Sequence, residues 1–412
     1  MNRKHLHAIL LAVVLLAAVG HSLLLYDMPF EDSYITFRYA ANLAEGNGLV
    51  YNSGERVEGF TSLGWTVLLA GVHAVGLDMP STARGLSLFF GLLLVLLTCQ
   101  LGARWLGNDK PWWALAALLV ATNGTFAYYA FTGMETSLFA LLVTLGFFEA
   151  TSKQKRAWIM AGVYFGLSAL VRPEGLGYWG LTCIWLLTDK DTRARVLPVG
   201  AVFLAIFVPY FAWRWHHFGF PLPNTYYAKA TPSTIRFAMG AKHFEQFFTL
   251  HLFWLAPIGA ALALTRKRWK NWARLALILL GGAVFNVVFV GGDTFAFYRF
   301  FLPVIPVGAI ATVAGMVHIF ESVGRRLGGR ARTAHLPVAA ALVALALFVV
   351  CASNFPRVSL LGGGGKSNLA TVQDVEKINR DYFAAGEALR ARLQPDQWIA
   401  VNAAGKIGRA HV

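Results

Sequence analysis

The chain has 412 residues, of which 57% are hydrophobic and only 14% are charged. A soluble domain of this size carries about a quarter charged residues, so the composition excludes an ordinary soluble enzyme or binding module. The formal charge of +15 does not indicate a nucleic-acid partner, because the basic residues stand in short connections between apolar runs. The composition predicts an all-α, polytopic membrane protein in contact with lipid.

Eleven apolar runs have lengths near the ~20 residues that a bilayer core requires, although two are short. The first follows "NRKH" and resembles a signal peptide. It is longer than a usual signal-peptide core and has no convincing small-residue cleavage site, so we expect a retained first span. The runs fall at residues 7–25, 82–104, 112–130, 134–151, 157–172, 175–188, 195–214, 244–264, 272–290, 300–320 and 335–352.

The basic clusters between these runs predict how the chain is oriented, because Lys and Arg mark cytoplasmic loops. They lie at the N-terminus and begin again at Arg104, Ser152, Asp189, Thr265 and Arg325. A further apolar run begins at Ser62, and counting it as a span would move three of these clusters to the far side. We therefore expect an interfacial helix there, about eleven spans, an inside N-terminus and an outside C-terminal tail.

This orientation brings the polar loops together on one face. They cover residues 26–62 within a first outer loop of 26–81, then 132–136, 172–175, 216–229 and 291–300. The opposite loops contain little except Lys and Arg. We expect a multi-pass protein of the inner (plasma) membrane whose site lies on the periplasmic or extracellular face.

The composition changes near residue 354, after the predicted membrane domain of residues 1–353. A "GGGGKSN" linker is followed by "DVEKINRDYFAAGEALRARL", which has helical spacing, and by "QWIAVNAAG", which is typical of a strand and turn. We expect residues 354–405 to be the truncated start of an extracytoplasmic α/β domain. Residues 406–412, "KIGRAHV", resemble the translation of a sequencing-adapter read-through.

An acidic pair, Glu31 and Asp32, follows the first span by a few residues. If "EDSYITFRYAANL" is helical, Glu31, Ile35 and Arg38 share one face. A lipid-linked substrate would hold its polar head at this depth. A carboxylate here could deprotonate an acceptor hydroxyl as that hydroxyl attacks a sugar carbon of the substrate. The alternative is that Asp32 or Ser33 only caps a surface helix, and the dipeptide alone leaves both open.

The longer run "EDSYITFRYAANLAEGNGLVYNSGERVEGFTSLGW" resembles the first outer loop of glycosyltransferase superfamily C (GT-C). Within it the run is similar to the membrane arabinofuranosyltransferase-like group, which includes terminal β-(1→2)-arabinofuranosyltransferases. The resemblance extends to "TGMET", "RPEG", "PLPNTYYAK" and "GGDTFAFYRFFLP", and so covers most of residues 1–305. The family's acidic pair is commonly Asp-Asp. Because Glu31 stands first here, we assign the general base to Asp32 and a supporting role to Glu31.

The resemblance implies an inverting transfer of a monosaccharide, with arabinofuranose suggested, from a polyprenyl-phosphate donor to a cell-envelope glycan or lipid. The departing phosphate needs fixed positive charge, for which Lys229, Arg299 and Arg172 are the candidates. Lys229 ends the "PNTYYAK" loop and is the first choice, and arginine offers a bidentate fork for phosphate oxygens. The alternative for Arg299 is an interfacial anchor beside aromatic residues.

The remaining polar residues of these loops are candidates for binding the sugar or the acceptor. Glu135 and Glu174 each open a span, where a purely structural role at the positive end of a helix is an equal alternative. Asp293 follows a "GG" turn and could bind hydroxyls or orient Arg299. The full set is Arg38, Glu135, Glu174, Asn224, Tyr226 and Asp293.

A divalent cation is left open. Hard oxygen ligands from Glu31, Asp32, Glu135 or Asp293 would suit Mg²⁺ or Ca²⁺. The adjacent histidines at 216–217 lack the spacing of a metal site, and we interpret them as interfacial polar residues.

Two other function classes also remain. An oligosaccharyltransferase or ligase would transfer a preassembled glycan, and a transporter or flippase would move polyprenyl-linked sugars. Transporters usually show internal repeats and ionisable residues in mid-membrane, and neither is evident here.

Overall fold

The structure is a computed structural model that describes residues 2–24, 32–224, 234–293, 295 and 297–327, with isolated positions at 381, 384 and 388. Within these residues every regular element is a helix. The predicted span at 335–352 and the tail at 406–412 lie outside the described residues, and so does nearly all of the predicted domain at 354–405. Glu31, Tyr226 and Lys229 also lie outside them.

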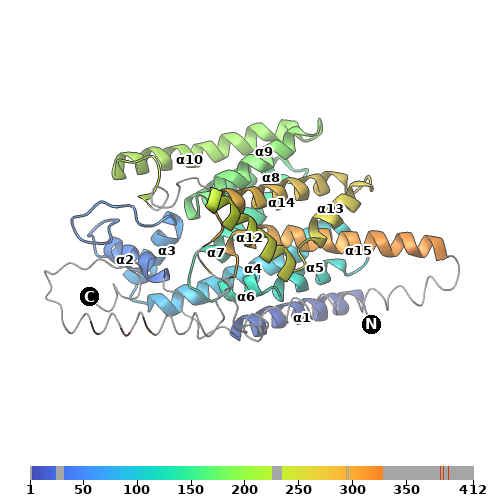
Figure 1. Cartoon of the computed structure of the whole chain (residues 1–412), viewed down its shortest axis with the longest axis horizontal. Coiled ribbons are helices and arrows are strands. Elements are labelled where there is room, and N and C mark those ends of the chain that lie inside the picture. The colour runs from blue at the N-terminus through green and yellow to red at the C-terminus, as the bar shows by residue number, and fades with distance from the viewer. Residues whose placement is uncertain are drawn as a thin grey trace.

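The helices follow one another in an up-and-down order, with the long ones running side by side (Figure 1). They are α1 (Arg3–Leu23), α2 (Ser33–Ala44), α3 (Leu63–Ala74), α4 (Met79–Leu106), α5 (Trp112–Ala121), α6 (Gly124–Tyr129), α7 (Thr136–Ala150), α8 (Lys155–Val171), α9 (Glu174–Leu187), η1 (Arg193–Arg195), α10 (Val196–Phe218), α12 (Thr234–Leu250), α13 (Leu255–Leu264), α14 (Lys270–Val290), η2 (Arg299–Val304) and α15 (Ile305–Leu327).

Five of the described helical segments are long and apolar enough to cross a membrane: α1, α4, η1 with α10, α14, and η2 with α15. A sixth candidate is the bent pair α12–α13. The other helices are shorter, so the count of eleven spans stays a prediction. Helix α3, in the apolar run that begins at Ser62, has 12 residues, and its place along the membrane surface stays a prediction.

Two runs predicted as single spans, 112–130 and 244–264, are each broken in the middle. Asn123 ends the first half, because its Oδ1 accepts hydrogen bonds from the backbone N–H groups of Thr125 and Phe126 and so caps α6. Helices α12 and α13 meet at 77°, and Leu252 between them has a φ of 49°. Asn123 Nδ2 and His251 Nδ1 lie 3.2 Å apart, so the two breaks face each other.

One end of the bundle is held by arginines of the basic clusters, which donate to carbonyls at the ends of other helices. Arg195 donates to the carbonyls of Ala150 and Ser152 at 3.1 and 2.9 Å, Arg274 donates to Thr188 at 3.2 Å, and Arg268 donates to Leu106. Cations at helix C-termini are favourable because of the macrodipole. The basic clusters therefore lie at one end of the bundle, as their positions between the apolar runs predicted.

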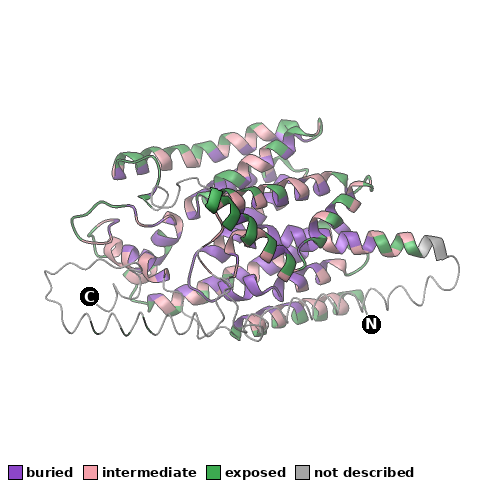
Figure 2. Cartoon of the chain, viewed as in Figure 1, coloured by how far each residue is buried: buried purple, intermediate pink, exposed green. Residues whose placement is uncertain are grey.

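The acidic loops lie at the other end, where α2 and α3 also sit (left in Figure 1). Helix α4 has 28 residues, which separates its two ends by roughly 40 Å. The main apolar core lies between these ends (Figure 2). Helices α13 and α15 pack closely within it, because a Cβ on Gly315 would lie 2.6 Å from the Cα of Gly259. Helix α10 instead exposes apolar side chains such as Leu197.

Candidate active site

The first polar loop is attached to α2 by side chains of the motif "RYAAN". Arg38 Nε donates to the carbonyl of Tyr51 at 2.7 Å, and its guanidinium lies 4.8 Å from the Tyr51 ring. Asn42 Nδ2 donates to the carbonyls of Val50 and Tyr51 at 2.8 and 3.0 Å. Arg38, which was predicted to bind sugar or acceptor, therefore connects α2 to the Tyr51 part of this loop.

Tyr39 holds the later part of the same loop. Its Oη donates to the Val57 carbonyl at 2.8 Å and accepts from the Gly59 N–H at 3.0 Å. Burial raises the pKa of Tyr39 to about 12, so the phenol remains a donor at neutral pH. A Cβ on Gly59 would lie 2.9 Å from this oxygen. Glycine at this point of "VEGF" is thus required for close approach.

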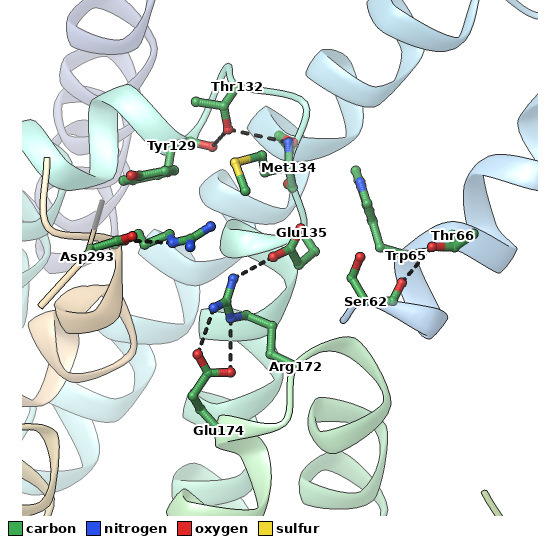
Figure 3. Close-up of polar contacts among 12 residues, drawn as sticks. Ser62, Trp65, Thr66, Tyr129, Thr132, Met134, Glu135, Arg172, Glu174 and Asp293 are labelled. Atoms are coloured by element: carbon green, nitrogen blue, oxygen red, sulfur yellow. Dashed lines mark hydrogen bonds and ion pairs between the residues drawn. The ribbon is translucent and has the colours of Figure 1, made fainter. Parts of the chain in front are cut away.

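The loop at residues 132–134 is fixed by three different helices. Ser33 Oγ of α2 donates to the Thr132 carbonyl at 2.7 Å, and Trp65 Nε1 of α3 donates to Gly133 at 3.1 Å. Ser87 Oγ of α4 donates to Met134 at 3.0 Å. The Ser33 contact brings the start of α2 beside the loop that leads into α7. Figure 3 shows Thr132, Met134 and Glu135 along this loop.

Asp32 immediately precedes the Ser33 contact and is half-buried. It occupies the N-cap position of α2, yet its side chain makes no capping hydrogen bond, and Ser33 reaches across to Thr132 instead. Asp32 therefore does not cap α2 through its side chain, and its role as the general base stays a prediction. The hydrogen bond from Ser33 to Thr132 keeps Asp32 next to residues 132–135.

Five charged residues from three loops form what we call the charged cluster: Glu135, Arg172, Glu174, Asp293 and Arg299. Arg172 Nη1 donates to Glu135 at 2.6 Å, while its Nε and Nη2 donate to Glu174 at 3.3 and 2.7 Å. Arg299 Nε donates to Asp293 at 2.7 Å. Figure 3 shows Glu135, Arg172, Glu174 and Asp293 facing one another from separate helix ends.

The two arginines share an aromatic neighbour, because the Phe300 ring lies 5.6 Å from the Arg172 guanidinium and 5.3 Å from that of Arg299. Burial acts to lower the pKa of Arg172, but Glu174 and Glu135 outweigh it and raise the value. Burial acts to raise the pKa of Glu174, and Arg172 outweighs that effect and lowers the value. With three carboxylates against two guanidiniums, the charged cluster has a formal excess of one negative charge.

The structure therefore brings together five of the predicted residues and leaves others apart. Asn224 is exposed at the end of a separate turn. The contacts through Ser33, Trp65, Ser87 and Phe300, and an ion pair between Glu58 and Arg214, were not predicted from the sequence. One signal for the last pair was available, since Arg214 is a cation within an apolar run.

No group of three or more His, Cys, Asp or Glu residues in the described part of the chain is arranged to hold a metal ion. Glu135 and Asp293, two of the predicted ligands, each pair with an arginine. Those contacts use the carboxylate oxygens for charge-assisted hydrogen bonds. A bound Mg²⁺ or Ca²⁺ stays a prediction, because Glu31, another of the candidate ligands, lies outside the described residues.

The fold matches solved GT-C structures. The archaeal oligosaccharyltransferase AglB from Archaeoglobus fulgidus, in complex with an inhibitory peptide and a dolichol-phosphate, aligns with a TM-score of 0.65 at 14% identity over 98% of this chain and 61% of AglB. ArnT from Cupriavidus metallidurans, bound to undecaprenyl phosphate, aligns with a TM-score of 0.59 at 16% identity over 98% of this chain and 84% of ArnT. At this level of identity the likeness shows a shared fold, and it is the fold that the loop motifs led us to expect.

Curated relatives narrow the resemblance, although no family model matches the chain. It is 33% identical over 266 residues to the terminal β-(1→2)-arabinofuranosyltransferase of Mycobacterium tuberculosis, covering 58% of this chain and 41% of the relative. It is 29% identical over 279 residues to the enzyme of that name from Corynebacterium glutamicum, covering 60% and 39%. The chain thus spans about two fifths of the length of these relatives, and it resembles this group as the sequence predicted.

Proposed function

We propose that the chain is an inverting glycosyltransferase that moves one sugar from a polyprenyl-phosphate donor to a hydroxyl of a cell-envelope glycan or lipid. The observation that carries the proposal is its similarity to two proteins named as terminal β-(1→2)-arabinofuranosyltransferases. ArnT is bound to undecaprenyl phosphate and AglB to a dolichol-phosphate in their structures, which supports a lipid-linked donor. The relatives' name makes arabinofuranose the first sugar to test.

The proposed reaction is a single displacement at the anomeric carbon. The acceptor hydroxyl oxygen forms the new glycosidic bond as the bond to the phosphate oxygen breaks, and polyprenyl phosphate leaves with the electron pair. Asp32, assisted by Glu31, takes the hydroxyl proton. One displacement inverts the anomeric configuration, so the product's stereochemistry is itself a test of this scheme.

The two arginines have different roles in this proposal. Arg172 uses Nε, Nη1 and Nη2 on carboxylates, so we assign it to positioning Glu135 and Glu174. Within the described residues Arg299 donates from its Nε to Asp293, and we assign its two Nη groups to a fork toward phosphate. Arg299 is therefore proposed as the phosphate contact together with Lys229, with Asp293 fixing its orientation.

Sugar and acceptor contacts are assigned to Glu174, Glu135, Asn224 and Tyr226. Glu174 has 21% of its side chain exposed, against 6% for Glu135, so Glu174 is the more accessible carboxylate. Either can accept from a sugar hydroxyl without releasing Arg172, because each carboxylate oxygen has two lone pairs.

The proposed location is the inner membrane, with the acidic end of the bundle on the extracytoplasmic side. The arginine-held end carries the basic loops, and the excess of Lys and Arg in such loops marks the cytoplasmic face. The remaining topology follows from this orientation: about eleven spans, an inside N-terminus and an outside soluble domain from residue 354.

The test is an assay of purified protein with a set of polyprenyl-phosphate monosaccharides, arabinofuranose included, and an arabinose-terminated oligosaccharide acceptor. We expect a glycosylated product and free polyprenyl phosphate by mass spectrometry, with the opposite anomeric configuration by NMR. Unconsumed donor together with transbilayer movement in vesicles would favour a flippase. Transfer of only preassembled glycans would favour a ligase. A parallel reaction with EDTA tests the metal.

A further inference from the structure

Another buried ion pair lies outside the charged cluster. It joins two residues that are 156 positions apart in the sequence. Arg214 Nε, in the last turns of α10, donates to Glu58 Oε1, in the loop before α3, at 2.8 Å. Their side chains are only 5% and 4% exposed. The pair lies beside a small apolar cluster that includes Phe60 and Phe218, separate from the main core. It is therefore the polar part of the junction between the first loop and α10.

From Glu58 the chain leads through the start of α3 toward the charged cluster. Four residues later the Ser62 carbonyl accepts from Thr66 N and Oγ1 at 2.9 and 3.0 Å, which starts α3. Trp65 of this first turn donates to Gly133, and Glu135 follows two residues on. Figure 3 shows Ser62, Trp65 and Glu135 along this line.

From Arg214 a second series leads to a different predicted contact. Its Nη1 donates to the carbonyl of Pro221 at 2.8 Å. Pro221 and Pro223 each have a fixed φ near −65°, so holding the Pro221 carbonyl limits where Asn224 stands. Asn224 is exposed and is the residue assigned to sugar or acceptor in this turn.

The ion pair between Glu58 and Arg214 is poorly suited to stabilise the fold. Glu58 Oε2 and Arg214 Nη2 are both buried and have no hydrogen-bond partner among the residues that the structure describes. Burial raises the pKa of Glu58 although Arg214 acts to lower it, so the carboxylate is incompletely compensated. Replacing a buried ion pair of this kind by well-packed apolar residues is often neutral or stabilising.

We infer that Glu58 and Arg214 are positioning residues, which set the Asn224 turn at a fixed place relative to the charged cluster. The inference rests on the proposed function, in which Asn224 and the charged cluster contact the same pair of substrates. On this inference the loop motif "ERVEGFT" has a role in arranging the substrates, in addition to the close approach of Gly59 to Tyr39 that shapes the loop.

The kinetic test compares Arg214→Lys with the apolar double variant Glu58→Leu/Arg214→Met. Lysine keeps the charge but replaces the planar fork, whose Nε and Nη1 donate to Glu58 and Pro221, with one compact ammonium group. We expect both variants to lose roughly 10- to 100-fold in kcat/KM for the acceptor, while the double variant keeps the wild-type melting temperature. A double variant with wild-type kinetics would show a purely structural pair and overturn the inference. Asp189→Asn, which breaks the ion pair to Arg274 at the opposite end, is the matched control and should keep wild-type kinetics.

Amide hydrogen exchange supplies a readout that does not need activity. We expect Arg214→Lys to speed exchange at residues 215–224 and 59–66 together, with no change in Asp189→Asn. If amide exchange at residues 215–224 is unchanged in Arg214→Lys, the positioning role is contradicted, even where sugar transfer is observed. Absence of transfer by the wild type with every donor would instead reject the proposed function, and the exchange result would still decide whether the pair positions the turn.

Discussion

Arg172 Nη1 lies 2.6 Å from Glu135 Oε1, an ion pair that joins the end of α8 to the start of α7 inside the bundle. The same guanidinium also pairs with Glu174 at the start of α9. One side chain thus fixes the relative positions of three helix ends. This contact gives the charged cluster a defined geometry.

Glu135→Ala should destabilise the protein by about 3–5 kcal/mol, because it leaves a buried guanidinium partly uncompensated. Thermal unfolding of the purified protein, followed by intrinsic tryptophan fluorescence, measures the effect. Glu149→Ala, on the same helix at the opposite end and partly exposed, is the matched control and should change stability far less. Equal losses in the two variants would argue against a central role for the Arg172–Glu135 contact.

Asp32→Asn should leave the fold intact and lower transfer by about 10²- to 10⁴-fold, the usual contribution of a general base. The amide keeps the size of the side chain but cannot accept the proton. Initial rates with the polyprenyl-phosphate donor measure the effect, and Asp109→Asn at the basic end serves as the control. Transfer by Asp32→Asn at the full wild-type rate would remove the assignment.

Arg299→Lys should weaken donor binding more than acceptor binding, because lysine keeps the charge but loses the fork proposed for the phosphate. We expect the KM for the donor to rise by roughly tenfold, about 1.4 kcal/mol, with a smaller change for the acceptor. Asp293→Asn should produce a milder form of the same change, since the amide still holds Arg299 but without charge. A selective rise in acceptor KM would instead place Arg299 at the acceptor.

Much of the helical pattern could be predicted from apolar periodicity, and the residues of the charged cluster could be named from their loops. The breaks at Asn123 and Leu252 could not, because an N-cap inside an apolar run and a residue at positive φ do not change hydropathy. The contact between Asp293 and Arg299 was one of the two roles predicted for Asp293, but the partners of Arg172 were beyond the sequence. Nothing in "RPEG" shows that Arg172 pairs with Glu135, since that contact depends on how α7 and α8 pack.

The acid sensitivity of the charged cluster follows from Glu174, whose pKa Arg172 holds below its usual 4.5 against the opposing effect of burial. A carboxylate with a lowered folded pKa adds stability above its unfolded pKa and loses it as the pH falls through the folded value. We expect the melting temperature to be flat from about pH 7 to about pH 5 and to fall below that. Glu174→Gln should be less stable at neutral pH and should narrow its difference from wild type in acid. A difference that stays constant across this range would mean that the Arg172 contact does not set the carboxyl's titration.

The close approach of Gly59 to Tyr39 predicts a large effect from one methyl group. In Gly59→Ala the added Cβ would lie 2.9 Å from Tyr39 Oη, so the phenol must move away from Val57 and Gly59 and lose its hydrogen bonds. We expect a destabilisation of about 1–3 kcal/mol from this overpacking, measured by thermal unfolding. Gly71→Ala in α3 is the control, because its Cβ would meet no atom within 4 Å and alanine favours a helix by about 1 kcal/mol. Should Gly59→Ala unfold at the wild-type temperature, the loop would have to be held by contacts other than those of Tyr39.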